Sequence, residues 1–214
     1  MSRYIKQLIT QGEHQQLDFK FEISDSRKIA RSLVAFANTD GGKLLVGVKD
    51  NGAIAGVRSD EEKHMVETAA RIFCKPEINF RTTEWEVDGK TVLEVDIEQD
   101  RYKPYYAQTP DDKWMVYIRV KDQNLLANKI LLRVWDKKQK QKGVKIKYTE
   151  PERFLLNYLK NKPDITLNKY YKLANISRRK AENILVNFIS LNIIDMEFTE
   201  KAVYYKLSNK DQDA

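Results

Sequence analysis

The sequence predicts an α+β fold in two domains, a mixed-sheet domain followed by a smaller and mainly helical one. Three observations support this prediction. Helical patterns and short apolar strands alternate up to about residue 130. Residues 137–147 (KKQKQKGVKIK) carry six lysines and no acid, as is typical of a linker. Three helical segments then precede a tail of alternating polarity. The expected parts are a domain at 1–134, a linker at 135–149 and a domain at 150–210.

The first domain opens with a predicted helix at residues 4–11, whose apolar side chains recur on one face. Residues 17–21 (LDFKF) alternate strictly between apolar and charged side chains, which predicts a half-buried strand with its charges facing solvent. Asp25 or Ser26 can cap a second helix, which runs to about residue 38, because their side-chain oxygens accept hydrogen bonds from the first helical amides.

Two glycines at 41–42 end that helix, and the apolar run at 43–48 (KLLVGV) predicts a strand buried on both faces. Asn51-Gly52 is a strong hairpin signal before a further strand at 53–57. A phosphate-binding loop follows a strand and opens a helix, whereas these glycines follow a helix and open a strand. We therefore interpret them as a helix C-cap and not as a nucleotide site.

The rest of the domain is predicted from turn signals. A helix starts at Ser59 or Asp60 and ends near Lys75-Pro76, because the residue before a proline disfavours helical geometry. Two strands flank Asp88-Gly89 in a hairpin, and residues 114–120 (WMVYIRV) form a further strand.

The C-terminal part has helical patterns at 153–161, 167–175 and 178–191, the last capped by Ser177. Residues 192–207 then alternate on both sides of a polar turn, which predicts a two-stranded hairpin. Three helices followed by a hairpin in about sixty residues is the outline of a winged helix-turn-helix.

The composition excludes several classes of protein. Cys74 is the only cysteine, so no intramolecular disulfide can form, and two histidines are too few for a structural zinc site of the usual kind. No segment reaches the roughly 18 consecutive apolar residues of a membrane span, and the first residues lack a hydrophobic stretch of signal-peptide length. We expect a soluble, cytoplasmic protein with no membrane partner and no cofactor beyond the metal considered below.

Basic residues indicate a nucleic-acid partner. The net charge is +7, and removing the six lysines of residues 137–147 leaves +1. This segment can lie along phosphates, or it is only a solvated tether. Its candidate contacts are Lys137, Lys138, Lys140 and Lys142.

In a winged helix-turn-helix, the third helix enters the major groove and its first residues contact DNA. Three cations follow Ser177 here, beside the positive end of the helix dipole, and a polyanion would offset the cost of that position. The alternative is a solvated helix start in a module that mediates dimerisation or packs on the first domain. The candidate contacts are Arg178, Arg179, Lys180, Lys169, Lys172 and, at the hairpin tip, Lys201.

A series of motifs in the first domain resembles a known family. The motifs are 13–20 (EHQQLDFK), 36–42 (FANTDGG), 47–56 (GVKDNGAIAG), 103–106 (KPYY) and 117–120 (YIRV). Together they resemble the Schlafen-type, AlbA-like DNA-binding domain over roughly residues 10–125. The chain departs from the family at residues 120–123 (VKDQ), where many members have a glycine-serine turn.

The resemblance implies a nucleic-acid-associated protein. Because bacterial members often carry a helix-turn-helix beside this domain, the leading hypothesis is a bacterial transcriptional regulator that prefers DNA over RNA. Such regulators commonly bind as homodimers, yet no sequence feature sets the number of subunits.

The resemblance also implies a second hypothesis, a divalent-metal-dependent endoribonuclease, because some animal Schlafen proteins cut RNA at a site of three carboxylates. The matching positions are Glu13, Asp18 and Asp50, with Lys20 beside them and Asp18 replacing the usual glutamate. Such carboxylates would hold Mg²⁺ or Mn²⁺, and the lysine would stabilise developing charge. The alternative is that Asp18 and Lys20 face solvent, Asp50 is a turn residue and Glu13 is a surface acid.

Overall fold

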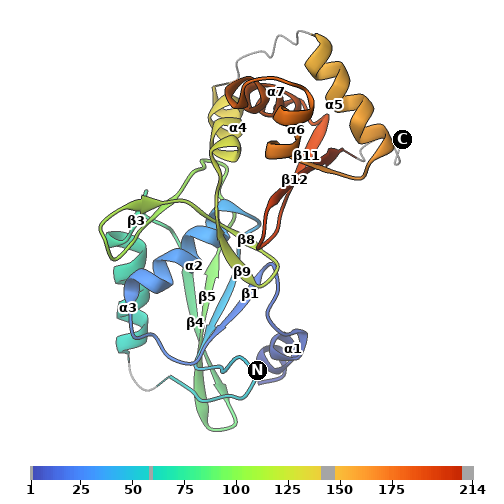
Figure 1. The fold of residues 1–214 in the computed structure, drawn as a ribbon. Helices are drawn as coiled ribbons and strands as arrows, with labels where there is room; N and C mark the ends of the chain where they lie inside the picture. The colour runs from blue at the N-terminus through green and yellow to red at the C-terminus, as the bar shows by residue number, and fades with distance from the viewer. Residues whose placement is uncertain (1, 58–59, 141–147, 209–214) are drawn as a thin grey trace. The chain divides into compact units, whose positions relative to one another are not determined.

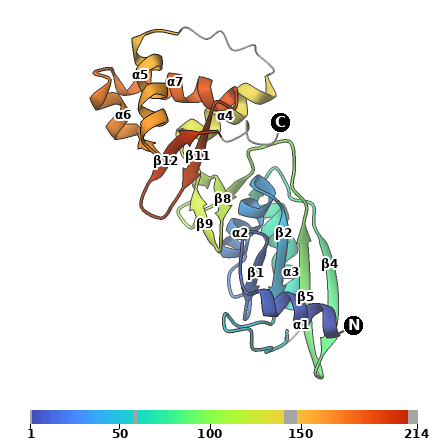
Figure 2. The ribbon, with the colours of Figure 1, turned by 90° about the vertical axis from the view of Figure 1, so that its right-hand side faces the viewer.

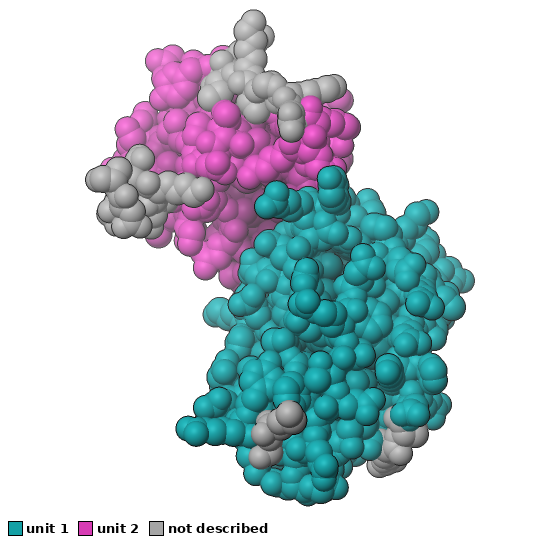
Figure 3. Space-filling view, turned by 180° about the vertical axis from the view of Figure 1, so that it is seen from behind, with its two compact units in different colours: residues 1–127 teal, residues 128–214 magenta. Residues whose placement is uncertain are grey.

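The computed structural model describes residues 2–57, 60–140 and 148–208, and the chain divides into two compact units (Figure 3). Unit 1 comprises Met1–Ala127, and unit 2 comprises Asn128–Ala214. None of the described helices is long and apolar enough to cross a membrane.

The elements of unit 1 are α1 (Ser2–Gln11), β1 (Leu17–Lys20), α2 (Ser26–Asn38), β2 (Gly42–Val46), α3 (Glu61–Ile72), β3 (Cys74–Lys75), β4 (Arg81–Val87), β5 (Lys90–Ile97), β6 (Tyr106–Gln108), β7 (Trp114–Met115), β8 (Tyr117–Val120) and β9 (Gln123–Leu126). The elements of unit 2 are α4 (Lys129–Gln139), α5 (Glu150–Asn161), β10 (Ile165–Thr166), α6 (Leu167–Leu173), α7 (Arg178–Ser190), β11 (Ile194–Phe198) and β12 (Val203–Leu207).

Unit 1 is built on a four-stranded sheet with the order β1-β2-β5-β4 (Figures 1 and 2). Strand β1 runs parallel to β2, and the other neighbours are antiparallel. Helices α2 and α3 cover one face, where Phe36, Leu44 and Val95 belong to the larger apolar core. Helix α1 covers the other face, where Ile5 and Leu45 belong to a second core. The predicted mixed α+β architecture is therefore confirmed.

Strand β1 is more deeply buried than its alternating pattern predicts. Leu17, Asp18 and Phe19 are all buried, and Asp18 is only 3% exposed. Ser32 from α2 and Arg119 from β8 both contact the Asp18 carboxylate, so these elements cover the polar side of the strand. The prediction that the charged side chains of this strand face solvent was therefore wrong for Asp18.

Helix α2 ends at Asn38 with Thr39 as its C-cap residue, so the glycines at 41–42 follow the cap and do not form it as predicted. Gly41 has a φ of +68°, a conformation that favours glycine, and its amide donates to the Phe36 carbonyl at 3.0 Å. Lys43 Nζ lies 2.6 Å from Glu94 Oε1, so this lysine is engaged within the sheet.

Two predicted strands differ from the structure. Within residues 53–57, only Ile54 forms a β-bridge, because the chain there folds back onto the carbonyl of Gly47. Residues 114–120 divide into β7 and β8, which pair with β6 and β9 in separate sheets. The hairpin of β4 and β5 forms around Asp88-Gly89 as predicted, with both turn residues at positive φ.

The described part of unit 2 combines four helices with an antiparallel sheet of order β10-β12-β11. Helix α4 is the main difference from the sequence prediction. Its Ile130 and Val134 are 3% and 2% exposed and belong to the core of this unit. The chain therefore divides after Ala127, earlier than the predicted boundary at 134, and α4 occupies the first part of the expected linker. Lys142 lies outside the described residues.

Candidate nucleic-acid interface

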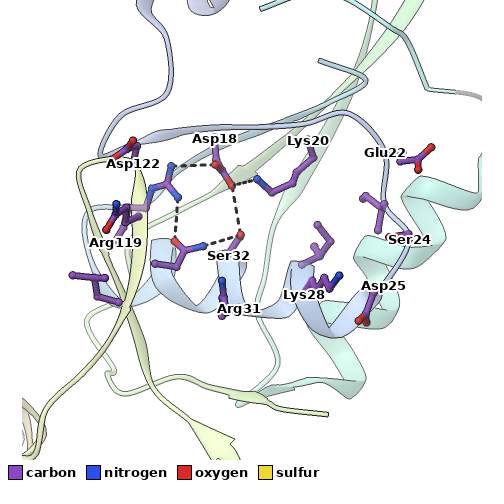
Figure 4. Close-up of a pocket in the computed structure, with 15 residues that line it drawn as sticks. Asp18, Lys20, Glu22, Ser24, Asp25, Lys28, Arg31, Ser32, Arg119 and Asp122 are labelled. Carbon is purple, nitrogen blue, oxygen red and sulfur yellow. Dashed lines mark hydrogen bonds and ion pairs between the residues drawn. The ribbon is translucent and has the colours of Figure 1, made fainter. Parts of the chain in front are cut away.

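A cavity of about 570 Å³ lies in unit 1 between β1, the start of α2 and the β8–β9 hairpin (Figure 4). Its lining carries equal numbers of basic and acidic side chains, so its formal charge is zero. A polyanion gains little long-range attraction from such a balanced lining. The charged residues are Lys20, Lys28, Arg31 and Arg119, and Asp18, Glu22, Asp25 and Asp122.

Arg119 forms the centre of a buried polar network at this cavity. Its side chain is 1% exposed, and its Nη2 donates to Asp18 Oδ1 and to the Leu17 carbonyl, each at 3.2 Å. Its Nη1 donates to Asn124 Oδ1 at 3.1 Å, and its guanidinium lies 5.2 Å from the centre of the Phe36 ring. Because a buried cation is costly unless it is paired and hydrogen-bonded, these contacts explain how strand β8 accommodates an arginine.

Asp18 completes the network from strand β1. Its Oδ2 lies 2.9 Å from Lys20 Nζ and accepts a weak hydrogen bond from Ser32 Oγ at 3.5 Å. Asn124 Nδ2 donates to the same hydroxyl at 3.0 Å, which closes a ring of polar contacts with Arg119 (Figure 4). The ring joins three elements that are distant in sequence, β1, α2 and the β8–β9 hairpin.

The pKa values of the neighbouring carboxyl groups of Glu13 and Asp18 move in opposite directions. Burial and the hydrogen bond with Asp18 raise the pKa of Glu13 from its usual 4.5 to about 7. Burial acts to raise the pKa of Asp18 as well, but the Glu13 hydrogen bond and the charges of Lys20 and Arg119 together lower it. Glu13 is therefore the proton donor of the pair, and Asp18 is the anion.

The three predicted metal ligands do not assemble into one site. Among the described residues, no group of three or more histidine, cysteine, aspartate or glutamate side chains could hold a metal ion. Asp50 is exposed in the turn after β2. It does not line the cavity that Asp18 lines. Both oxygens of Asp18 already contact cations, Arg119 and Lys20. These residues do not fit Mg²⁺ or Mn²⁺, so we assign no metal-dependent step.

In unit 2, the predicted cations at the start of α7 are exposed. Ser177 caps this helix, with its Oγ accepting a hydrogen bond from the Lys180 amide at 3.2 Å. Arg178 Nε lies 3.3 Å from Glu182 Oε1, whereas Arg179 and Lys180 have no acidic partner among the described residues. The first turn of α7 therefore presents positive charge to solvent.

The other predicted basic contacts in unit 2 lie in different surroundings. Lys201 is exposed in the turn between β11 and β12, and Lys172 is exposed in α6. Lys169 Nζ lies 5.4 Å from the centre of the Tyr158 ring. These positions keep all three lysines accessible to a partner.

The lysines predicted as linker contacts make contacts inside unit 2. Lys137 Nζ donates to Asn187 Oδ1, and Lys138 Nζ donates to Asn192 Oδ1 at 3.4 Å. Lys140 Nζ lies 2.6 Å from Asp136 Oδ1, one turn earlier in α4. The described part of the expected linker is therefore a helix that packs on α7, and not an open tether.

Helix α4 packs against the side of α7 that lies opposite the core and contacts Asn183 and Asn187 there. The inward face carries Ala181, Leu185 and Phe188, so Asn183 and Asn187 point to the opposite side of the helix. On that side, the guanidinium of Arg133 donates to Asn183 Oδ1, and Val186 is only 3% exposed. Helix α4 therefore packs along part of the side of α7 that lies opposite the core, while Asn183 on that side stays exposed. Helix α4 lies outside the segments predicted as helical.

A family model described as Schlafen, AlbA_2 matches residues 13–128, just over half of the chain. The chain belongs to the Schlafen AlbA_2 family. The matched region coincides with nearly all of unit 1, from Glu13 in the loop before β1 to the end of β9.

Two solved structures resemble part of the chain. The DIP2311 protein from Corynebacterium diphtheriae is 21% identical with a TM-score of 0.43, over 58% of this chain and 24% of that chain. The N-terminal domain of the "Putative ATP-dependent DNA Helicase RecG-related Protein" from Nitrosomonas europaea is 22% identical with a TM-score of 0.42. That match covers 58% of this chain and 95% of that domain. The chain thus spans about a quarter of the DIP2311 protein, and no curated protein matched it.

Within the AlbA_2 domain, sequence reasoning missed three members of the polar network. Arg119 interrupts an otherwise apolar strand, and Ser32 interrupts the apolar face of α2; each was a usable signal of a buried polar contact. Asn124 carried no such signal, because asparagine after a tight turn is common.

Proposed function

We propose that this chain binds duplex DNA through unit 2 and acts in transcription regulation. Unit 2 serves as a winged helix-turn-helix in this proposal, with α5, α6 and α7 as its helices and β11–β12 as its wing. The order of elements supports this assignment, because three helices precede a hairpin that pairs with the short strand β10. Membership of the AlbA_2 family supports a nucleic-acid-related role.

One observation carries the proposal, namely the exposed cations Arg179 and Lys180 in the first turn of α7. Cations there oppose the helix dipole by roughly 0.3–1 kcal/mol each. Neither residue has an acidic partner among the described residues to offset that cost. A phosphate backbone would provide the missing negative charge, and Lys201 at the hairpin tip would extend the contact.

The proposal is tested by fluorescence anisotropy with a labelled DNA duplex at several salt concentrations. The double variant Arg179→Ala, Lys180→Ala should bind more weakly, and the slope of log K against log salt should fall by roughly 2, since each phosphate contact contributes about 0.9. The matched control is Lys160→Ala, Lys162→Ala at the end of α5, which removes the same charge. Equal affinity of the double variant and the wild type would refute the proposal.

The endoribonuclease hypothesis has less support from the geometry. It requires Asp50 to join Glu13 and Asp18, and among the described residues these side chains form no common site. We therefore propose the binding function alone, with the polar network of Asp18 and Arg119 acting as a structural clamp within the AlbA_2 domain.

A further inference from the structure

A second cavity, of about 360 Å³, lies within unit 2 between the starts of α4 and α7 and the β11–β12 turn. Three basic side chains line it, Lys129 from α4, Arg178 from α7 and Lys201 from the turn. Among the described residues of its lining, Glu182 is the only acid, so these residues carry a formal charge of +2. This cavity differs in that respect from the neutral cavity of unit 1.

Glu182 does not neutralise the positive charge of this cavity. Glu182 has 13% of its side chain exposed, and its oxygens lie 3.3 Å from Arg178 Nε and 3.9 Å from Arg133 Nη1. Lys129 and Lys201 are both exposed, and neither has an acidic partner among the described residues. The lining of the cavity also includes Tyr205, which is 1% exposed. Two lysines on different elements are thus available to one anionic group.

The same arrangement limits what α7 can recognise. Asparagine is a side chain that reads adenine edges in the major groove. Both asparagines on the outward face of α7, Asn183 and Asn187, accept hydrogen bonds from Arg133 and Lys137 of α4. While α4 is packed in this way, the Oδ1 atoms of both asparagines are engaged, although Asn183 itself is exposed.

We propose that unit 2 holds a backbone phosphate of nucleic acid in this cavity, with Lys129 of α4 as a phosphate contact beside Arg178 and Lys201. Helix α4 is then part of the nucleic-acid interface and not a linker. A phosphate held in this cavity is recognised through the nucleic-acid backbone and not through base edges, so this contact does not depend on base sequence. This inference rests on the proposed function and adds to it a new contact and a mode of recognition.

The experiment measures the affinity of the full chain for labelled DNA duplexes of unrelated sequence, with an RNA duplex as a second arm. Lys129→Ala should weaken binding to every DNA duplex by roughly threefold to tenfold and lower the salt slope by about 1. The matched control is Lys160→Ala, an exposed lysine of α5 outside the cavity. Circular dichroism checks that both variants are folded. Stronger binding to the RNA arm with the same Lys129 dependence would support the phosphate site with RNA as its source.

Two results would overturn the inference while leaving the proposed function intact. The first is that Lys129→Ala binds DNA as tightly as Lys160→Ala does. The second is that selection from a random duplex library enriches one base sequence and that Asn187→Ala abolishes the preference, since α7 would then read bases after α4 had moved. Absence of any nucleic-acid binding by the wild type would overturn the proposed function as well.

Discussion

The buried pair of Asp18 and Arg119 gives a direct test of what holds unit 1 together. Replacing Arg119 by methionine keeps much of the side-chain volume but removes the donors to Asp18 and Asn124. Removing one member of a buried ion pair costs about 3–5 kcal/mol of unfolding free energy. Because Lys20 Nζ remains 2.9 Å from Asp18 Oδ2, we expect a value near the lower end, about 3 kcal/mol.

The measurement is urea-induced unfolding followed by tryptophan fluorescence in a Trp135→Phe background. Trp135 lies in α4, whereas the other two tryptophans, Trp85 and Trp114, lie in unit 1, so the remaining signal reports on unit 1. The matched control is Arg81→Met, because the Arg81 side chain is 71% exposed and pairs only at the surface. We expect that control to cost less than about 1 kcal/mol.

A double-mutant cycle measures the coupling between Asp18 and Arg119. Asp18→Asn leaves Arg119 buried without its carboxylate, so it should cost about as much as Arg119→Met. The two changes together should cost at least about 1 kcal/mol less than the sum of the single changes, since residues in one network couple. A loss below about 1 kcal/mol for Arg119→Met, or additive single effects, would refute the view that this pair is a structural clamp.

Three further predictions follow from unit 1. Glu13 has a pKa of about 7 in the native state and 4.5 in the unfolded chain, so the native state binds its proton more tightly. The unfolding free energy should therefore fall as the pH rises from about 4.5 to about 7. We expect a fall of about 1 kcal/mol, because partial exposure of Glu13 reduces the effect. Glu13→Gln should remove that fall in urea titrations at several pH values; an unchanged slope would contradict the assignment. Gly41→Ala should destabilise by more than about 1 kcal/mol in the same assay, because φ is +68° and a Cβ would lie 2.7 Å from the Ile97 carbonyl oxygen. Millimolar Mg²⁺ or Mn²⁺ should leave the thermal midpoint unchanged in wild type and in Asp50→Asn alike, and a metal-dependent rise would reinstate the carboxylate site.

Local signals predicted much of the fold. The N-capped helix α2 with its apolar face and the hairpin around Asp88-Gly89 depend on residues close in sequence, and they form as predicted. The burial of Asp18 could not be predicted in the same way. Alternation along β1 shows that one side is apolar, but the element that covers its other side, β8, comes about a hundred residues later.

The same limit applies to the site in unit 2. The lysine-rich composition from Lys137 onward is that of a solvated linker, and only the packing of Ile130 and Val134 shows that its first part belongs to a helix. Those two apolar residues lie one helical turn apart, four positions along the chain, which was a usable but weak signal. The face of α7 against which they pack could not be read from the sequence, because the contact joins residues about fifty positions apart.

The charges of the two cavities favour unit 2 as the part that meets a polyanion. In unit 1, Lys20 is held by Asp18, and loss of the Glu13 proton near pH 7 adds a negative charge beside that pair. The cavity of unit 1 therefore attracts phosphate less strongly as the pH rises. In unit 2, Lys129 and Lys201 face a cavity whose single acid is already paired with arginines, so a phosphate there need not displace a lysine's partner. Affinity for DNA should accordingly depend on the cations of unit 2 and should survive loss of the Asp18 network, as long as unit 2 remains folded.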